Sequence, residues 1–358
     1  MRIYHGPVNI AGIGAVLADY QRKKGYESCF DVWVGNSFFK NHDVEIFNGT
    51  ENRWLKQLVR LKYFYNSLFR FDIYSFYFGQ TLLPYSLDLP LLKLLGKKIV
   101  MTYCGSDIRL SEVEKERNPY WEIIVENFSG GLNDPKKDNT KKIKMLWQGI
   151  WVDKFIAPRN LYHSASLYIP RYKIIKDVWV HNLSFSEFLN DYSAAPLVKK
   201  NALNESIVIV HAPTSPAIKG TKYFNTVISN LIRDGYDIEY IELTNMDHKD
   251  VVHELYKADI VLDQILLGGF GSLSVEAMAF GKPVICYLIE SVKEKHYPEC
   301  PIVNANISNI EDKIKELVSN KEYRDLLSQK GVGFVRDNFD YIKINEQVID
   351  IYNELIDD

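Results

Sequence analysis

Residues 268–276 combine residue types that could bind a phosphorylated ligand. The glycines of this segment let the backbone approach a ligand closely, and the first N–H groups of the helix expected to follow are free donors for a diphosphate. The lone carboxylate of that helix, Glu276, can accept hydrogen bonds from two ribose hydroxyls. Together these groups predict a binding site for a sugar nucleotide.

Two strands are expected to hold this loop at the edge of a sheet. The apolar run 258–263 predicts a buried strand before the loop, and 284–288 predicts another after the helix, which should end at Gly281. The loop would then lie at the carboxyl end of a parallel strand, where open α/β sheets bind ligands. A strand, loop and helix without any ligand is the alternative, since glycine clusters alone are weak evidence.

The segment resembles the donor-binding motif of retaining glycosyltransferases of the GT-B fold, in the large family 4 group. In that motif a Glu-Gly-Phe-Gly loop runs to a second Glu eight positions on; the first Glu contacts the donor sugar and the second holds the ribose. This chain has Gly268 at the first position and Glu276 at the second. The resemblance therefore implies that Glu276 holds the ribose. It leaves the diphosphate and sugar to the backbone amides of Gly269, Phe270, Gly271, Ser272 and Leu273.

A lysine in the same half of the chain matches a second part of the family pattern. Lys219 corresponds to the lysine that pairs with an upstream arginine to neutralise the departing nucleoside diphosphate. The arginine has no counterpart, because residues 214–216 are Thr, Ser and Pro. Arg109, Arg159, Arg171 or helix dipoles are the candidates to replace its charge. A solvent-exposed surface lysine is the alternative for Lys219.

Two turns in the amino-terminal half complete the resemblance. The turn 104–109 is similar to the family's His-Gly-Ser-Asp-Ile-Arg turn near the reacting sugar, with Cys104 in place of the histidine. Cysteine lacks the two ring nitrogens of histidine, and Asp107 could instead pair with Arg109 or cap a helix. Gly12 and Gly14 match the glycine turn that faces the donor phosphates and the acceptor, although a tight strand-to-helix turn explains them equally. The resemblance assigns catalytic roles to Cys104, Asp107 and Lys219, and donor contacts to Gly12, Gly14 and Lys219.

Length and alternation of elements predict two α/β domains. A chain of 358 residues exceeds what one core usually organises, and a strand–helix alternation restarts at residue 206. We expect the GT-B fold, with two Rossmann-like, doubly wound parallel sheets facing across a cleft. The expected parts are an N-terminal acceptor-side domain at 1–181, a linker at 182–204, a nucleotide-sugar-binding domain at 205–335 and a C-terminal helix at 336–358 that packs back on the first domain. Expected helices are 15–24, 53–70, 221–234, 247–257 and 342–356.

The composition of the chain argues against some classes of protein. The 43 basic and 46 acidic side chains nearly cancel, which argues against a nucleic-acid binder. There is no apolar run of ~18 residues, no secretory leader and no close cysteine pair, so a cytoplasmic protein with reduced thiols is expected.

The segment 53–65 is aromatic and basic, and a helical projection places Trp54, Leu58, Leu61, Tyr65 and Leu68 on one face. We expect this face to pack on the sheet. Peripheral attachment to the inner membrane surface stays open as the alternative.

No metal or cofactor is expected beyond the donor substrate, because the sequence contains no Asp-x-Asp motif. His248 and His253 with Asp247 and Asp250 could suggest a metal site, but helical spacing spreads the two histidines over different faces. A surface helix capped by Asp247 is therefore expected. The absence of a visible general base fits a retaining mechanism in which a leaving phosphate oxygen accepts the proton of the acceptor.

The predicted function is transfer of a hexosyl group from a nucleotide sugar to a carbohydrate or lipid-linked saccharide in polysaccharide biosynthesis, with retention of configuration. Two other classes stay open. One is a non-catalytic subunit, suggested by the missing glutamate, histidine and arginine. The other is a sugar-nucleotide epimerase or a phosphorylase on the same fold.

Overall fold

The computed structural model describes residues 1–35, 41–49, 52–127, 131, 133–178, 180 and 206–357. The predicted linker at 182–204 lies outside these residues. By internal contacts the chain forms two units. The first comprises the described parts of Met1–Leu110, Pro135–Glu187 and Tyr341–Asp358, and the second those of Ser111–Asp134 and Phe188–Asp340.

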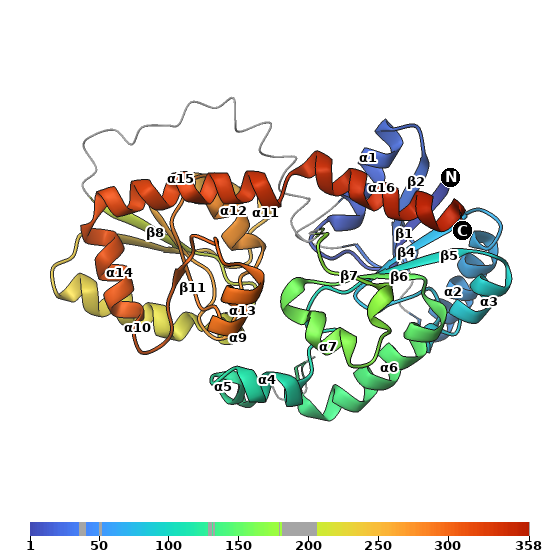
Figure 1. Cartoon of the computed structure of the whole chain (residues 1–358), viewed down its shortest axis with the longest axis horizontal. Helices are drawn as coiled ribbons and strands as arrows, with labels where there is room; N and C mark the ends of the chain where they lie inside the picture. Colours follow the sequence, from blue (N-terminus) through green and yellow to red (C-terminus); the bar gives the residue numbers. More distant parts are fainter. Residues whose placement is uncertain are drawn as a thin grey trace. The chain divides into compact units, whose positions relative to one another are not determined.

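The first unit contains, within its described residues, a parallel sheet in the order β3-β2-β1-β4-β5-β6-β7 (Figure 1). Its strands are β1 (Arg2–Gly6), β2 (Glu27–Val32), β3 (Val44–Glu45), β4 (Ile73–Tyr77), β5 (Lys98–Thr102), β6 (Lys154–Ile156) and β7 (Ile174–Ile175). Its α-helices are α1 (Ile13–Lys23), α2 (Arg53–Ser67), α3 (Leu89–Leu94), α6 (Asp138–Trp151), α7 (Tyr162–Ser166) and α16 (Tyr341–Asp357). Short 3-10 turns are η1 (Pro84–Ser86), η2 (Pro135–Lys137), η3 (Arg159–Leu161) and η4 (Arg171–Lys173).

Helices cover both faces of this sheet, with α1 and α16 on one face and α2, α3 and α6 on the other (Figure 1). The central strands β1, β4 and β5 are buried almost throughout, as parallel strands between two helical layers must be. The C-terminal helix α16 packs on this unit: the Tyr352 hydroxyl donates to Ser75 Oγ at 2.9 Å, and the Tyr20 hydroxyl donates to Glu346 Oε1 at 2.6 Å.

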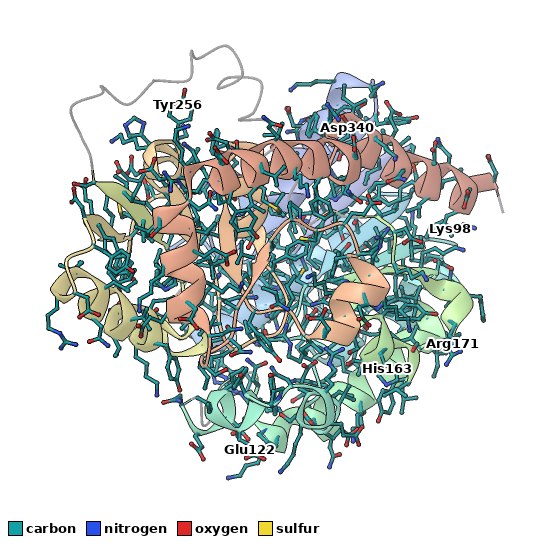
Figure 2. All side chains as sticks on the ribbon, turned by 60° about the vertical axis from the view of Figure 1, so that its left-hand side comes forward. Lys98, Glu122, His163, Arg171, Tyr256 and Asp340 are labelled. Carbon is teal, nitrogen blue, oxygen red and sulfur yellow. The ribbon has the colours of Figure 1, made fainter. Side chains whose placement is uncertain are left out.

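The second unit contains a parallel sheet in the order β12-β11-β10-β8-β9 among its described residues. Its strands are β8 (Ile207–His211), β9 (Ile238–Glu242), β10 (Ile260–Leu262), β11 (Val284–Cys286) and β12 (Val303–Asn304). Its helices are α4 (Ser111–Arg117), α5 (Trp121–Glu126), α9 (Pro216–Lys219), α10 (Thr221–Arg233), α11 (His248–Lys257), α12 (Ser272–Ala279), α13 (Glu290–His296), α14 (Ile310–Ser319) and α15 (Lys321–Asn338). Side chains fill the layers between the sheets and their helices (Figure 2).

The described residues of 111–134, which we expected in the N-terminal domain, group with the second unit. Asn118 Nδ2 donates to the carbonyl of Leu266 at 2.8 Å, and the ring of Tyr120 lies edge-on to that of Tyr287 with centroids 5.0 Å apart. These contacts join residues more than 140 positions apart in the chain. They place α4 and α5 beside the glycine loop.

The orientation of α2 differs from the sequence expectation. Of the five side chains expected to pack on the sheet, Leu68 is buried, but Trp54, Leu58, Leu61 and Tyr65 are exposed. Phe64 is buried as well, and the guanidinium of Arg60 lies over aromatic rings of the first unit. These side chains form the packed side of α2, and most of the predicted apolar face lies outside.

No helix among the described residues is long and apolar enough to cross a membrane.

Candidate functional site

A buried carboxylate, Asp263, organises the carboxyl edge of the second sheet. It directly follows β10, and its side chain is fully buried. Its Oδ1 accepts a hydrogen bond from Lys219 Nζ at 2.5 Å, and its Oδ2 accepts from Gly271 N at 2.9 Å and Ser274 Oγ at 2.6 Å. Through these hydrogen bonds Asp263 connects the end of α9, the glycine loop and the first turn of α12.

Asp263 is ionised in this setting. Burial by itself raises the pKa of a carboxyl, but the charge of Lys219 and the hydrogen bonds from Lys219, Ser274 and Gly271 outweigh burial and lower the pKa of Asp263 below its ordinary value. The side chain of Lys219 is 14% exposed, so it is not fully enclosed by the protein. Sequence reasoning singled out Lys219 but missed Asp263, because the two are 44 residues apart and only the parallel pairing of β8 with β10 brings them together.

The glycine loop lies where the sequence predicted, after a parallel strand and before α12. One of its amides is not available to a ligand as expected: the N–H of Gly271 donates to Asp263. Phe270 packs its ring against Tyr297, with centroids 4.8 Å apart, and Leu273 is buried. Ser272 begins α12, so it stands at the positive end of the helix dipole.

The path of the loop favours a glycine at position 268. Its φ is +74°, and a Cβ placed there would lie 2.5 Å from two side-chain carbons of Ile289. Its carbonyl also accepts a hydrogen bond from the Ile289 N–H at 3.1 Å. A glutamate at this position would strain the backbone and clash, so the departure from the family motif has a local structural cause.

A second left-handed glycine positions Lys219. Gly220, with φ +82°, ends α9 and begins α10. A Cβ here would lie 2.4 Å from Ile265, and the carbonyl of Lys219 accepts from the Ile265 N–H at 3.0 Å. The lysine is therefore held against the loop that follows β10.

Glu276 is not alone on its helix face. Only 4% of the residue is exposed, and its Oε1 accepts a hydrogen bond from Nε2 of His248 at 3.0 Å. Burial would lower the pKa of His248, but the hydrogen bond to Glu276 and the carboxylate charge raise it above its ordinary value. The surface-helix expectation is therefore wrong for His248, which lies at the start of α11 against Glu276, whereas His253 is exposed.

His211, at the end of β8, is a structural residue. Its Nδ1 lies 2.8 Å from the carbonyl oxygen of Leu262, which can only accept, so Nδ1 carries the hydrogen. Its Nε2 therefore accepts from the Thr221 hydroxyl at 2.9 Å. Burial lowers the pKa of His211 to about 4, and the neutral ring links β8 to β10.

In the first unit, Asp107 closes the turn after β5. Its Oδ1 accepts from the Gly105 N–H at 2.6 Å, and both carboxylate oxygens lie 3.2 Å from the Cys104 nitrogen. Burial raises the pKa of Asp107, while the charge of Lys144 opposes that shift. Burial, followed by the charge of Asp107, raises the pKa of Cys104 well above its ordinary value. The Cys104 side chain is therefore a neutral thiol and is unsuited to act as a nucleophile.

The glycines of the first turn are explained by packing. Gly12 has φ +73°, begins α1 and donates its N–H to Asn9 Oδ1 at 3.0 Å. A Cβ on Gly14 would lie 2.5 Å from the ring of Phe30. These contacts do not test the donor role that the resemblance implied for Gly12 and Gly14.

The first unit also contains a pocket of about 560 Å³. Its walls come from α2, η1, α6 and the segments after β2 and β4, and include Trp33, Arg60, Lys144 and Trp147. Arg60 Nε is buried without a hydrogen-bond partner among the described residues. The lining residues include no aspartate or glutamate, so the pocket suits a ligand with an apolar and an anionic part.

Within the described residues no group of three or more His, Cys, Asp and Glu side chains could hold a metal ion. The predicted site residues fall in both units. Gly12, Gly14, Cys104 and Asp107 belong to the first, whereas Lys219, residues 269–273 and Glu276 belong to the second.

Comparison with known proteins agrees with this architecture. Residues 235–332 match the family model described as "Glycosyl transferases group 1". Sucrose-phosphate synthase from Thermosynechococcus elongatus superposes with a TM-score of 0.63 at 12% identity, covering 99% of each chain. HepE from Anabaena, solved in complex with UDP, gives 0.63 at 13% identity and covers 99% of this chain and 100% of its own. The chain has the GT-B fold.

The same fold includes another kind of protein. A structure from Listeria monocytogenes named for UDP-N-acetylglucosamine 2-epimerase gives a TM-score of 0.58 at 12% identity, covering 97% of this chain and 94% of the other. Identities this low relate the folds alone. No curated protein sequence matches the chain.

Proposed function

We propose that this protein is a glycosyltransferase that moves a hexosyl group from a nucleotide sugar to a carbohydrate or lipid-linked saccharide, with retention of configuration and without a metal. The observation that carries the proposal is the placement of Lys219, held by buried Asp263, next to the start of α12, the helix that bears Glu276. A cation, a helix N-terminus and a carboxylate acceptor are what a diphosphate attached to a ribose requires. The match of residues 235–332 to glycosyl transferases group 1 supports the same conclusion.

The proposed chemistry uses Lys219 and the start of α12 to stabilise the charge that grows on the leaving diphosphate. The bond between the anomeric carbon and the diphosphate oxygen breaks, and the acceptor oxygen bonds to the same face of that carbon. The proton of the acceptor hydroxyl passes to a phosphate oxygen. Glu276 accepts hydrogen bonds from the ribose hydroxyls, and the imidazole of His248 keeps its carboxylate oriented.

Binding of UDP tests the donor site, and the UDP held by HepE makes UDP the first nucleotide to try. We expect Glu276→Gln to weaken UDP binding at least about tenfold, because one charge-assisted hydrogen bond is worth ~1.5–3 kcal/mol. Lys222→Ala is the matched control, since Lys222 is an exposed lysine three positions from Lys219. Isothermal titration giving equal affinity for Glu276→Gln and the unchanged protein would contradict the site.

We also propose that the pocket of the first unit receives the acceptor. Its aromatic walls can stack on sugar rings or cover an apolar tail, and Arg60 and Lys144 can pair with a phosphate. Trp147→Ala should raise the KM for the acceptor and leave the KM for the donor unchanged. A rise in the KM for both substrates would argue against separate sites for the donor and the acceptor.

Epimerisation is the second candidate, supported by the likeness to the Listeria monocytogenes protein. Incubation with a UDP-sugar alone separates the two: an epimerase yields a new UDP-sugar without any acceptor, whereas a transferase yields UDP only when an acceptor or water takes the sugar. A protein that binds UDP but yields neither product is a non-catalytic subunit.

A further inference from the structure

The outward face of α2 is an apolar stripe. Trp54 is 81% exposed, Leu58 64%, Leu61 53% and Tyr65 67%, and their spacing of four, three and four residues places them on one side of the helix. Phe69, just beyond the helix, is exposed as well. Single exposed apolar residues are common on protein surfaces. A continuous row that contains tryptophan and tyrosine is typical of a surface that binds a membrane or another molecule.

The helix cannot turn this stripe inward. On its packed side the Tyr63 hydroxyl donates to a carboxylate oxygen of Asp31, and the Tyr74 hydroxyl of β4 donates to the carbonyl of Ser67 at 2.6 Å. Arg60 lies 4.8 Å from the ring centroid of Trp33. Asn52 caps the start of the helix by accepting from the backbone N–H groups of Trp54 and Leu55. The stripe is therefore a permanent feature of the folded first unit.

The charge of the residues around the stripe indicates what kind of surface binds it. Residues 53–70 contain five basic side chains and no acidic one, although the whole chain carries a net charge of −3. Of these, Arg53 and Lys62 are exposed, and their positions in the helix place them on either side of the stripe. A basic helix with an aromatic and aliphatic face matches a surface with anionic headgroups over a hydrocarbon layer, where Trp and Tyr occupy the boundary.

We propose that α2 docks this protein on an anionic lipid bilayer, with Trp54, Leu58, Leu61 and Tyr65 in the headgroup layer. The helix lies in the plane of the surface, and Arg53 and Lys62 contact lipid phosphates. Membrane docking through α2 does not depend on binding of a nucleotide sugar, so its test is independent of the test of the proposed transferase activity.

Co-sedimentation with vesicles tests the docking. The unchanged protein should pellet with vesicles of phosphatidylcholine and phosphatidylglycerol and stay in the supernatant with phosphatidylcholine alone. The triple variant Trp54→Gln/Leu58→Gln/Leu61→Gln should bind the anionic vesicles at least about tenfold less tightly. The matched control Ile232→Gln/Leu326→Gln/Ile342→Gln removes three exposed apolar side chains from other helices and should bind as the unchanged protein does.

The basic residues have a separate prediction. Arg53→Gln/Lys62→Gln should lower the affinity for anionic vesicles by about thirtyfold, and added salt should weaken binding of the unchanged protein in the same direction. All variants change exposed side chains, so their thermal unfolding midpoints and their binding of UDP should match those of the unchanged protein. Equal binding to neutral and anionic vesicles, or full binding by the stripe variant, would overturn the proposal. A second result would also overturn the proposal. It is the absence of binding to either kind of vesicle, together with a dimer in sedimentation that the stripe variant abolishes.

Discussion

Replacing Lys219 by methionine should destabilise the second unit strongly and in a pH-dependent way. The substitution leaves the fully buried carboxylate of Asp263 without its counter-charge. Removal of one partner from a buried ion pair costs ~3–5 kcal/mol. Asp263 keeps its hydrogen bonds from Gly271 and Ser274, and Lys219 is 14% exposed, so we expect the lower end, about 3 kcal/mol at neutral pH.

The sign of the pH dependence follows from the pKa of Asp263. In the unchanged protein this pKa is lowered on folding, so the pair stabilises the fold above the unfolded pKa and that contribution is lost as the pH falls through the folded value. In Lys219→Met the opposing charge is gone and burial raises the pKa instead. The cost of the substitution should then shrink as the pH is lowered toward ~5, where a neutral Asp263 is no longer an unpaired charge.

The double variant Lys219→Met/Asp263→Asn separates stability from function. Replacing both members of the pair leaves no buried charge, so stability should return to within about 1.5 kcal/mol of the unchanged protein. Affinity for UDP should stay low, because the ammonium that meets the diphosphate is still missing. Urea unfolding followed by circular dichroism gives the stability, using the transition that bound UDP shifts, and titration calorimetry gives the affinity. A single variant as stable as the unchanged protein, or a double variant that binds UDP normally, would refute the reasoning.

Three further predictions concern single positions. Gly268→Ala should lower stability by ~1–3 kcal/mol because of its positive φ and the contact with Ile289, whereas Gly333→Ala, with open space on a helix, should be neutral or stabilising; thermal unfolding of the two compares them directly. The raised pKa of His248 means that its bond to Glu276 stabilises the fold below the unfolded pKa of about 6.5 and weakens as the pH rises through the folded value. An NMR titration should show the raised pKa of His248 in the unchanged protein and a pKa below its ordinary value in Glu276→Gln, because burial then acts without the opposing carboxylate. Cys104→Ala should change glycosyl transfer by less than about tenfold, since its raised pKa keeps the thiol neutral, and a hundredfold loss would show that the thiol takes part.

Local patterns predicted the elements around the site well. Helices expected at 221–234, 247–257 and 342–356 form at Thr221–Arg233, His248–Lys257 and Tyr341–Asp357. Each has a continuous apolar periodicity, and the first ends where a glycine adopts positive φ, at Gly235. Periodicity did not predict which side of α2 is packed, because the partners of that side, the rings of Trp33 and Phe47 beside Arg60 and the carboxylate of Asp31 beside Tyr63, come from other parts of the chain.

The sequence by itself determined the chemistry that is local in the chain: a glycine loop at the end of a strand, the start of α12 and the carboxylate of Glu276 in one short segment. Tertiary structure alone decided which groups these side chains meet. Asp263 binds Lys219, and His248 binds Glu276, because parallel strands and their crossover helices bring residues 44 and 28 positions apart to one sheet edge. A short segment fixes its own hydrogen bonds and turns, but the partner of a buried charge depends on which distant strand lies next to it.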